Sequence, residues 1–510
     1  MSAAQIGMLV TMLVYLLGMI LTGFMFKDTN KTVGDFYLGG RKLGPLVTAM
    51  SAEASDMSSY LLMGLPGLAY FSGMAEVSWT ILGLSLGTYF NWLITAKRLR
   101  RYTEKINAIT VPSFFSKRYD DKKNFLMCIA AVEIVLFFIP YTASGFAACG
   151  KLFSSLFNVN YYLAMLISAL VIIAYTSLGG FLAASTTDFI QSIIMTIALV
   201  TILIFGVNVA GGMDQVLANA KTMSGYFSLN RSYNIATASS SSFDVIAIIS
   251  TMAWGLGYFG MPHILLRFMA IEDDRKLSIS RRVASIWAFL SMLISLLIGM
   301  VGLKMSHIGA IPSLDESASE TVIIEISKLL SNHGFLAVIV AGVVLSGILA
   351  STMSTADSQL LAASSSISSD ILSHTFGIKL DDKKQMLVSR LVLLVIAVLG
   401  VFLAWNPNSS VFGIVSFAWA GFGASFGPAM ILALYWKRSN KFGALAGMVS
   451  GGIMIFVWKF LVRSLGGAWD IYELLPAFIV ALLFDIVVSL LTEAPEKDVT
   501  EKFEEVASMK

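Results

Sequence analysis

The sequence predicts an all-α polytopic membrane protein with about 13 transmembrane helices. Its composition is the first observation: 56% of the 510 residues are hydrophobic and only 13% are charged, whereas soluble domains average roughly 45–50% apolar and about 25% charged residues. The second observation is a series of apolar segments, each near the roughly 20 residues that a helix needs to cross a bilayer. The third is a pair of interrupted apolar segments about 200 residues apart, which predicts an inverted five-plus-five repeat with broken second and seventh spans.

The apolar segments define the predicted spans in order. They lie at residues 5–26, 45–71, 75–96, 125–149, 160–178, 187–210, 243–262, 283–305, 335–369, 387–405, 411–436, 441–463 and 471–492. We divide the chain into a first span with a cytoplasmic entry loop (1–44), a first five-helix repeat (45–210), a second five-helix repeat (243–436), two additional spans (437–492) and a cytoplasmic tail (493–510).

The distribution of basic residues predicts the orientation. With thirteen spans, one side of the membrane receives 28 of the 35 Lys and Arg residues, in the loops 27–43, 97–123, 263–282, 370–390 and 437–441 and in the tail. The positive-inside rule therefore places the N-terminus outside and the C-terminus in the cytoplasm of a plasma-membrane protein. The dense basic run KRLRRYTEK fits contact with anionic membrane lipid, and we expect no binding of nucleic acid.

The second predicted span contains the sequence SAEASDMSSYLLMGLPG, at residues 51–67. It carries two acidic residues, Glu53 and Asp56, together with several serines and Pro66. One acidic residue at the centre of a membrane helix costs roughly 2.5–3.5 kcal/mol on insertion scales. Two of them beside helix-weakening residues predict a broken helix whose freed backbone groups face a ligand.

The seventh predicted span is interrupted in the same way, by three glycines in GLGYFG and by Pro262. Each interrupted segment starts a set of five spans, and an odd number of spans makes the two sets inverted. Broken helices in two inverted halves indicate the binding site of a secondary transporter. Close helix packing is the alternative explanation for the glycines.

The ninth predicted span is rich in hydroxyl groups. Ser351, Ser354, Thr355 and Ser358 recur at i, i+3, i+4 and i+7, so they share one helix face. Hydroxyl and carbonyl oxygens are ligands that a small hard cation prefers. Small polar residues also serve as packing residues between membrane helices. With Asp357 among them and two broken helices elsewhere, a cation site is the better interpretation.

Other function classes find no support in the sequence. GLGYFG matches a dinucleotide-binding pattern but lies inside a predicted span without a βαβ context. We find no Walker A sequence and no catalytic triad, so we expect no enzyme. Cys128 and Cys149 share one predicted helix about 30 Å apart, too far for a disulfide.

Several of these segments resemble a known family. The motifs SAEASDMSSYLLMGLPG, YTASG, GGFLAASTTDFIQ, WGLGYFGMPHIL and ASTMSTADSQLL are similar to those of the sodium/proline symporters in the solute:sodium symporter family. The likeness extends over nearly the whole chain. It implies a leucine-transporter-like fold and Na⁺-coupled uptake of L-proline by alternating access, with Na⁺ as the coupling ion.

The resemblance also implies site residues. The sodium ligands would be the backbone oxygens of Ala54, Met57 and Ser351 and the hydroxyls of Ser354 and Thr355. Asp56 and Asp188 match acidic residues needed for sodium coupling, and a second cation would use Asp188, Ser354, Asp357 and Ser358. The substrate contacts would be Tyr60, Tyr141, Trp254, Tyr258 and Pro262.

The chain departs from the proline symporters at four places. Ser59, Tyr60 and Met261 stand where those proteins have glycine, tryptophan and glutamine, and Glu53 replaces a small residue. The alternative hypothesis is therefore a symporter of the same fold that carries a different small organic solute, or one that is coupled to protons. A membrane sensor or channel is the hypothesis from another class, and the tail after residue 492 is short for a signalling domain.

Overall fold

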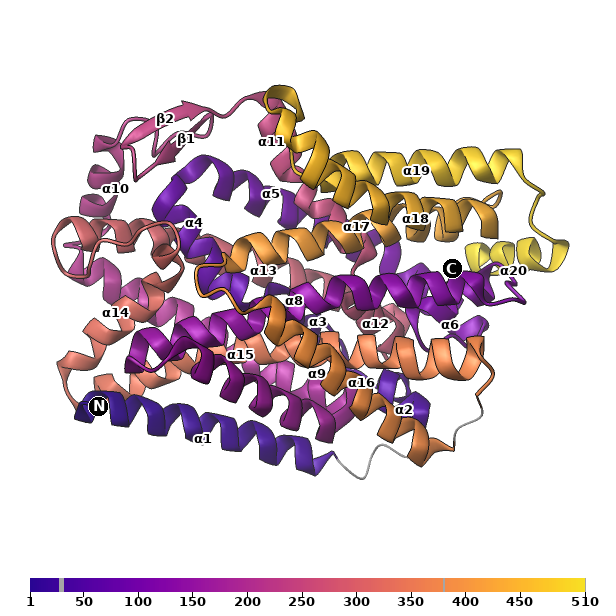
Figure 1. Ribbon diagram of the computed structural model, residues 1–510, viewed down its shortest axis with the longest axis horizontal. Coiled ribbons are helices and arrows are strands. Elements are labelled where there is room, and N and C mark those ends of the chain that lie inside the picture. The colour runs from indigo at the N-terminus through magenta and orange to yellow at the C-terminus, as the bar shows by residue number, and fades with distance from the viewer. Residues whose placement is uncertain (27–31, 379–380, 510) are drawn as a thin grey trace.

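The computed structural model describes residues 1–26, 32–378 and 381–509. Within these residues, nine helices are long and apolar enough to cross a membrane, or ten if one bent helix pair counts as a span. The long helices run in roughly one direction, horizontal in Figure 1, with α1 along one edge of the bundle and α18 and α19 along another. The predicted multi-helix membrane architecture is confirmed. Residues 27–31 and 379–380 of two predicted cytoplasmic loops lie outside the described residues.

The first half of the chain contains ten α-helices and three shorter helical turns. They are α1 (Ala3–Met25), α2 (Val33–Leu38), η2 (Gly39–Arg41), α3 (Pro45–Ser59), η3 (Tyr60–Gly64), α4 (Leu65–Ser72), α5 (Met74–Phe90), η4 (Asn91–Ala96), α6 (Lys97–Lys105), α7 (Val111–Arg118), α8 (Phe125–Phe157), α9 (Tyr161–Val209) and α10 (Met213–Thr222).

The second half begins with a β-hairpin and is then helical to its end. Its elements are β1 (Arg231–Asn234), β2 (Ser239–Ser242), α11 (Val245–Met252), η5 (Ala253–Gly260), α12 (Pro262–Ala270), η6 (Asp274–Lys276), α13 (Leu277–His307), η7 (Ala318–Thr321), α14 (Val322–Leu330), η8 (Ser331–His333), α15 (Phe335–Ser365), η9 (Ser366–Thr375), α16 (Asp382–Leu403), α17 (Val411–Tyr435), α18 (Lys441–Val457), η10 (Trp458–Val462), η11 (Arg463–Leu465), η12 (Gly467–Trp469), α19 (Leu474–Leu491) and α20 (Lys497–Ser508).

Both predicted helix breaks are present. In the second predicted span, Ser58 has φ 45° and ψ −167°, and the π-helical turn η3 follows it. In the seventh, α11 and η5 are bent by 47° relative to α12. Pro262 is the first residue of α12, where its missing N–H is not needed for a helical hydrogen bond.

Two features differ from the predicted layout. The fifth and sixth predicted spans form one helical run, α9, with a single non-helical residue at Gly180 (φ 65°, ψ −172°). Glycine tolerates this positive φ, so the chain changes direction there without a loop. The all-α prediction also omits the antiparallel β1–β2 hairpin, in which Arg231 pairs with Ser242. Its serines give no apolar alternation, the signal by which a half-buried strand is predicted.

The serine-rich helix α15 lies at the centre of the bundle. It packs against α1, α3, α8 and α9, and every residue from Val344 to Ser365 on it is buried. The hydroxyl groups of the predicted cation site therefore face other helices rather than lipid.

The basic run in α6, for which the sequence predicts contact with membrane lipid, packs against other parts of the protein. Arg98 donates to the carbonyl of Leu434, and its guanidinium lies 4.2 Å from the ring centre of Tyr435. Lys105 forms a 2.7 Å ion pair with Glu505 of α20, and α20 packs on α6. The tail helix and the basic run thus form one surface.

The contact between α5 and η5 requires glycine, and it generates a prediction. A Cβ atom at Gly87 would overlap the backbone of Gly255 in η5, whereas a Cβ atom at Gly18 of α1 would meet no atom within 4 Å. Because overpacking costs about 1–3 kcal/mol, we expect Gly87→Ala to lower the melting temperature of the purified protein and Gly18→Ala to leave it unchanged or higher. Equal melting temperatures would contradict this account of the contact.

Candidate ion and solute site

Helices α3 and α15 bring four of the predicted sodium-ligating residues together. The Ser354 hydroxyl donates to the carbonyl of Ala54, one helical turn before the break at Ser58, at 2.8 Å. The carbonyl of Ser351 accepts from Ser354 at 3.3 Å and from the Thr355 hydroxyl at 3.0 Å. All of these side chains are at least 96% buried. Two carbonyls and two hydroxyls in contact form a donor set that suits a small hard cation.

Met57, the fifth predicted ligand, lies at the break itself. Its carbonyl accepts a hydrogen bond from the backbone N–H of Tyr60. Met57 also lines a small cavity together with Asp56 and Tyr60. The structure therefore places Met57 between the α3–α15 contact and the aromatic residues predicted to bind substrate.

Asp56 links the two broken helices. Its Oδ2 accepts a 2.6 Å hydrogen bond from the Tyr258 hydroxyl of η5, and its backbone carbonyl accepts one from the Tyr141 hydroxyl of α8 at 3.1 Å. The other carboxylate oxygen, Oδ1, has no hydrogen-bond partner among the described residues. Asp56 is thus a buried acid with one oxygen still able to accept a bond.

Aromatic rings surround this acid. Trp254 stacks on Tyr60 and on Tyr472, with ring centres 5.7 Å and 5.1 Å apart, and the indole N–H of Trp419 donates to the Trp254 carbonyl at 2.8 Å. The cavity between them has a volume of about 10 Å³ and is lined by Asp56, Met57, Tyr60, Leu84, Tyr141, Trp254, Val415 and Trp419.

The cavity holds three of the five predicted substrate contacts. Tyr60, Tyr141 and Trp254 line it. Tyr258 is not part of the lining but donates a hydrogen bond to Asp56, which is. Pro262, the first residue of α12, lies outside the lining. Its volume admits about one water molecule, so a solute enters only if the rings move apart. Sequence reasoning missed Leu84, Val415 and Trp419 because nothing in their local sequence marks them as lining a site.

The four residues predicted to hold a second cation divide between two clusters. Ser354 belongs to the α3–α15 contact. Asp188 instead forms a 3.0 Å ion pair with Arg267 of α12, which also donates to the Ser358 hydroxyl at 2.5 Å. That hydroxyl donates to Asp357 at 3.1 Å.

Arg267 corrects the predicted loop at 263–282. An apolar segment that ends at Pro262 predicts a cytoplasmic loop for this arginine, but Arg267 lies in α12 and is 1% exposed. Its position within a run of apolar residues was a signal in the sequence, since an ionisable residue inside a membrane helix is by default a functional candidate.

Glu53 lies on another side of α3. Its Oε1 accepts the indole N–H of Trp92 in η4 at 3.2 Å, and its Oε2 has no hydrogen-bond partner among the described residues. Met261 and Ser59, which also depart from the proline symporters, are fully buried. The departures therefore all lie in the interior, near the two breaks.

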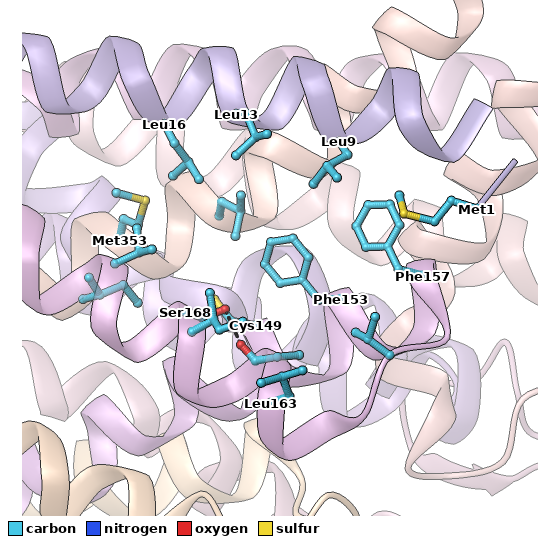
Figure 2. A pocket seen from close by; sticks show the side chains of 16 residues that line it. Met1, Leu9, Leu13, Leu16, Cys149, Phe153, Phe157, Leu163, Ser168 and Met353 are labelled. Carbon is cyan, nitrogen blue, oxygen red and sulfur yellow. Dashed lines mark hydrogen bonds between the residues drawn. The ribbon is translucent and has the colours of Figure 1, made fainter. Parts of the chain in front are cut away.

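A separate pocket lies between α1, α8, α9 and α15. Figure 2 shows its lining, which includes Leu9, Leu13 and Leu16 of α1 and Phe153 and Phe157 of α8. Its volume is about 300 Å³. Leucine and phenylalanine side chains dominate this lining, so it offers no set of oxygen ligands for a cation.

Comparison with known proteins gives one family. The model of the sodium:solute symporter family matches residues 36–451. The osmoregulated proline transporter OpuE of Bacillus subtilis (strain 168) is 40% identical over 495 residues, which cover 97% of this chain and 96% of that protein. The sodium/proline symporter of Escherichia coli (strain K12) is 41% identical over 506 residues, or 99% of this chain and 97% of that protein.

Solved structures show the same fold. A Na⁺-coupled sialic acid symporter in a substrate-bound outward-open state superposes with a TM-score of 0.77 at 17% identity, covering 96% of this chain and 99% of that chain. MhsT in complex with L-phenylalanine gives a TM-score of 0.52 at 14% identity, covering 88% of this chain and 98% of that chain.

The bond between Tyr258 and Asp56 generates a prediction. Tyr258→Phe removes a hydrogen bond to a buried carboxylate, and such a loss costs about 1.5–3 kcal/mol. Tyr161→Phe is the matched control, because the Tyr161 hydroxyl donates to the neutral carbonyl of Ala404 at 2.8 Å. We expect the larger fall in melting temperature for Tyr258→Phe. An equal or smaller fall would show that the hydrogen bond from Tyr258 to Asp56 does not stabilise the protein more than a bond to a neutral carbonyl does.

Proposed function

Since the chain belongs to the sodium:solute symporter family, we propose that it couples uptake of L-proline to inward movement of Na⁺ across the plasma membrane. The family consists of symporters, so the chain is a transporter and not an enzyme. Relatives at about 40% identity over nearly their whole length are named as proline transporters. The contact of Ala54 with Ser354 across α3 and α15 is the observation that carries the proposal, because it assembles an oxygen-ligand set at a helix break.

The proposed topology has thirteen spans, with the N-terminus outside and the C-terminus in the cytoplasm. Two inverted sets of five spans, 45–210 and 243–436, would place the breaks in α3 and η5 at corresponding positions. Segment 1–44 would add a first span before them, 437–492 would add two spans after them, and 493–510 would be the cytoplasmic tail. The interrupted helices and the nine or ten qualifying spans among the described residues support this arrangement.

Na⁺ would bind from outside to oxygens of both helices. The carbonyls of Ala54, Met57 and Ser351 and the hydroxyls of Ser354 and Thr355 would surround it. The ion replaces the Ser354 hydrogen as the partner of the Ala54 carbonyl and so holds the α3 break against α15. Asp56, two residues after Ala54, would add negative charge near the ion and is connected to η5 through Tyr258.

Proline would bind between the two breaks. Its carboxylate suits the backbone N–H groups at broken helix ends and a nearby cation. Its apolar ring suits Tyr60, Tyr141 and Trp254, and its ammonium is attracted to the faces of such rings. Because the cavity is small, binding and release need the rings of η3 and η5 to separate, which fits alternating access.

The driving force is sufficient for accumulation. One charge crossing 100 mV contributes about 2.3 kcal/mol, and a tenfold sodium gradient contributes about 1.4 kcal/mol. Together they sustain roughly several hundred-fold accumulation of the solute.

Glu53 favours a second candidate function, a symporter of the same fold that is coupled to protons or carries another small solute. It is 1% exposed, and one of its carboxylate oxygens has no hydrogen-bond partner among the described residues. Tyr60 and Met261 would then adapt the pocket to the other solute.

Uptake of radiolabelled proline into proteoliposomes tests the proposal. We expect uptake with an inward sodium gradient and background uptake with choline in place of sodium. Asp56→Asn should reduce sodium-driven uptake at least tenfold, because it removes the buried charge beside the ion. Asp485→Asn changes a buried acid on α19 outside the site and should retain uptake. Proline uptake that does not respond to sodium would contradict sodium coupling, and no proline uptake under either gradient would contradict the substrate.

Variants that each remove a single hydroxyl group test the proposed sodium ligands. Ser354→Ala removes a ligand worth about 1.5–3 kcal/mol, so the half-saturating sodium concentration should rise roughly 10–100-fold. Ser346→Ala on the same helix removes a hydroxyl that donates only to its own helix, at the Gly342 carbonyl, and should leave sodium dependence unchanged. Equal shifts for the two variants would place the sodium elsewhere.

A further inference from the structure

We propose that the groove between α9 and α13 binds one anionic phospholipid, with its acyl chains along the groove and its phosphate on Arg282. The groove has a volume of about 510 Å³ and shares no lining residue with the small solute cavity. Helix α13 supplies most of its lining, α9 supplies the opposite wall, and α3 supplies Met50. The proposed topology places the loop before α13 in the cytoplasm, so the lipid would belong to the cytoplasmic leaflet.

One face of α13 gives the groove its length. Five lining residues recur at i, i+3, i+4, i+7 and i+11 and so share this face: Val283, Ile286, Trp287, Leu290 and Ile294. At 1.5 Å per residue this face is about 16 Å long. The hydrocarbon core of a bilayer is roughly 30 Å thick, so the groove has about the depth of one leaflet.

The polar side chains inside the groove already have partners. The Trp287 indole N–H donates to the Thr196 hydroxyl across the groove at 2.8 Å, and that hydroxyl donates to a carbonyl of its own helix. The Ser291 hydroxyl donates to the Ala288 carbonyl at 3.1 Å. A hydrophilic solute would lose its bonds to water here without replacing them, which is costly, whereas an acyl chain needs no such partner. The interior of the groove therefore suits hydrocarbon.

Arg282 supplies an unneutralised positive charge at the end of the groove nearest the loop. Its side chain is exposed, and its guanidinium makes no ion pair or hydrogen bond within the described part of the chain. Two basic residues just before it are neutralised, since Arg275 pairs with Asp273 at 2.9 Å and Lys276 with Glu272 at 2.6 Å.

A free guanidinium beside hydrocarbon matches the chemistry of a phospholipid. Its planar fork of N–H groups binds phosphate oxygens in pairs, and basic pockets between membrane helices on the cytoplasmic side bind anionic headgroups. A zwitterionic headgroup also contains a phosphate, but its own ammonium offsets the negative charge. The anionic lipid is therefore the stronger ligand.

Met50 connects the groove to the broken helix. It is 8% exposed and lies one turn before Ala54, whose carbonyl contacts Ser354. Helix α3 packs against both α9 and α13. A lipid in the groove thus touches the half of α3 that precedes the break at Ser58, and movement of this half-helix alters the surface on which the lipid lies.

Native mass spectrometry of the purified full-length protein, titrated with phosphatidylglycerol or phosphatidylcholine, tests the proposal. We expect the wild type to bind one phosphatidylglycerol more tightly than phosphatidylcholine. Arg282→Gln removes a charge-assisted hydrogen bond and should weaken phosphatidylglycerol binding roughly 10–100-fold. Arg282→Lys keeps the charge and should retain most of the preference.

Arg281→Gln is the matched control for charge. Arg281 is the preceding residue, but its guanidinium lies 5.3 Å from the ring centre of Tyr89 on α5 and is not part of the lining. Loss of a basic residue near a membrane surface weakens attraction to anionic lipid by only about fivefold. A larger effect at Arg282 therefore reports the groove.

A second pair of variants tests the groove itself. Val200 lines it and is 38% exposed, whereas Ile204, one turn further along α9, is 59% exposed and lies outside the lining. Val200→Trp fills open space rather than the core, so it should fold and abolish the preference for phosphatidylglycerol. Ile204→Trp should bind like the wild type.

Three results would overturn the proposal. They are equal wild-type affinity for the two lipids, equal losses in Arg282→Gln and Arg281→Gln, and unchanged phosphatidylglycerol binding by Val200→Trp, which would place the lipid on the surface. The first result needs no variant, so the proposal is testable even if a variant fails to fold. The measurement involves no transport. Failure of lipid binding and failure of sodium-coupled uptake are therefore distinguishable.

Discussion

The break in α3 is the constraint on which the rest of the site depends. Ser58 holds a backbone conformation that L-residues with a side chain rarely adopt (φ 45°), and such conformations cost about 1–3 kcal/mol each. The Ser58 hydroxyl accepts the N–H of Tyr60, which partly compensates for the interrupted helix. The interruption turns Met57 and Tyr60 toward the aromatic cavity, while Ala54, one turn earlier, stays against Ser354 of α15. Ion contact and solute contact thus originate from neighbouring turns of one helix.

The buried acids around this break are satisfied in different ways. Glu53 receives an indole N–H, Asp56 receives a phenol hydroxyl, and Asp188 receives a full positive charge from Arg267. An unpaired charge in a low-dielectric interior is costly, and hydrogen bonds from neutral groups offset only part of that cost. Asp188 is therefore paired with a cation, whereas Asp56 has no positively charged partner among the described residues.

Much of this arrangement could be predicted from local sequence signals. Apolar segment length predicts where the helices lie, and acidic, glycine and proline residues within such segments predict both breaks. The shared face of Ser351, Ser354 and Thr355 follows from helical periodicity alone. Partners from distant elements could not be predicted in this way. Trp419 reaches the cavity, and Tyr472 reaches Trp254, only through tertiary packing. A proline often marks the end of a helix, so the sequence predicts a loop for Arg267, whereas Pro262 starts the buried helix α12.

If sodium holds the broken helix α3 against α15, the ion will slow hydrogen–deuterium exchange at that contact, and exchange measured with peptide resolution detects this. Purified protein in sodium chloride would be compared with the same protein in choline chloride. We expect slower exchange in sodium for the backbone amides of residues 51–60 and 351–358, with no change in α20 or the β1–β2 hairpin. Equal exchange at those two segments in both salts, or slowing spread evenly over the chain, would contradict it.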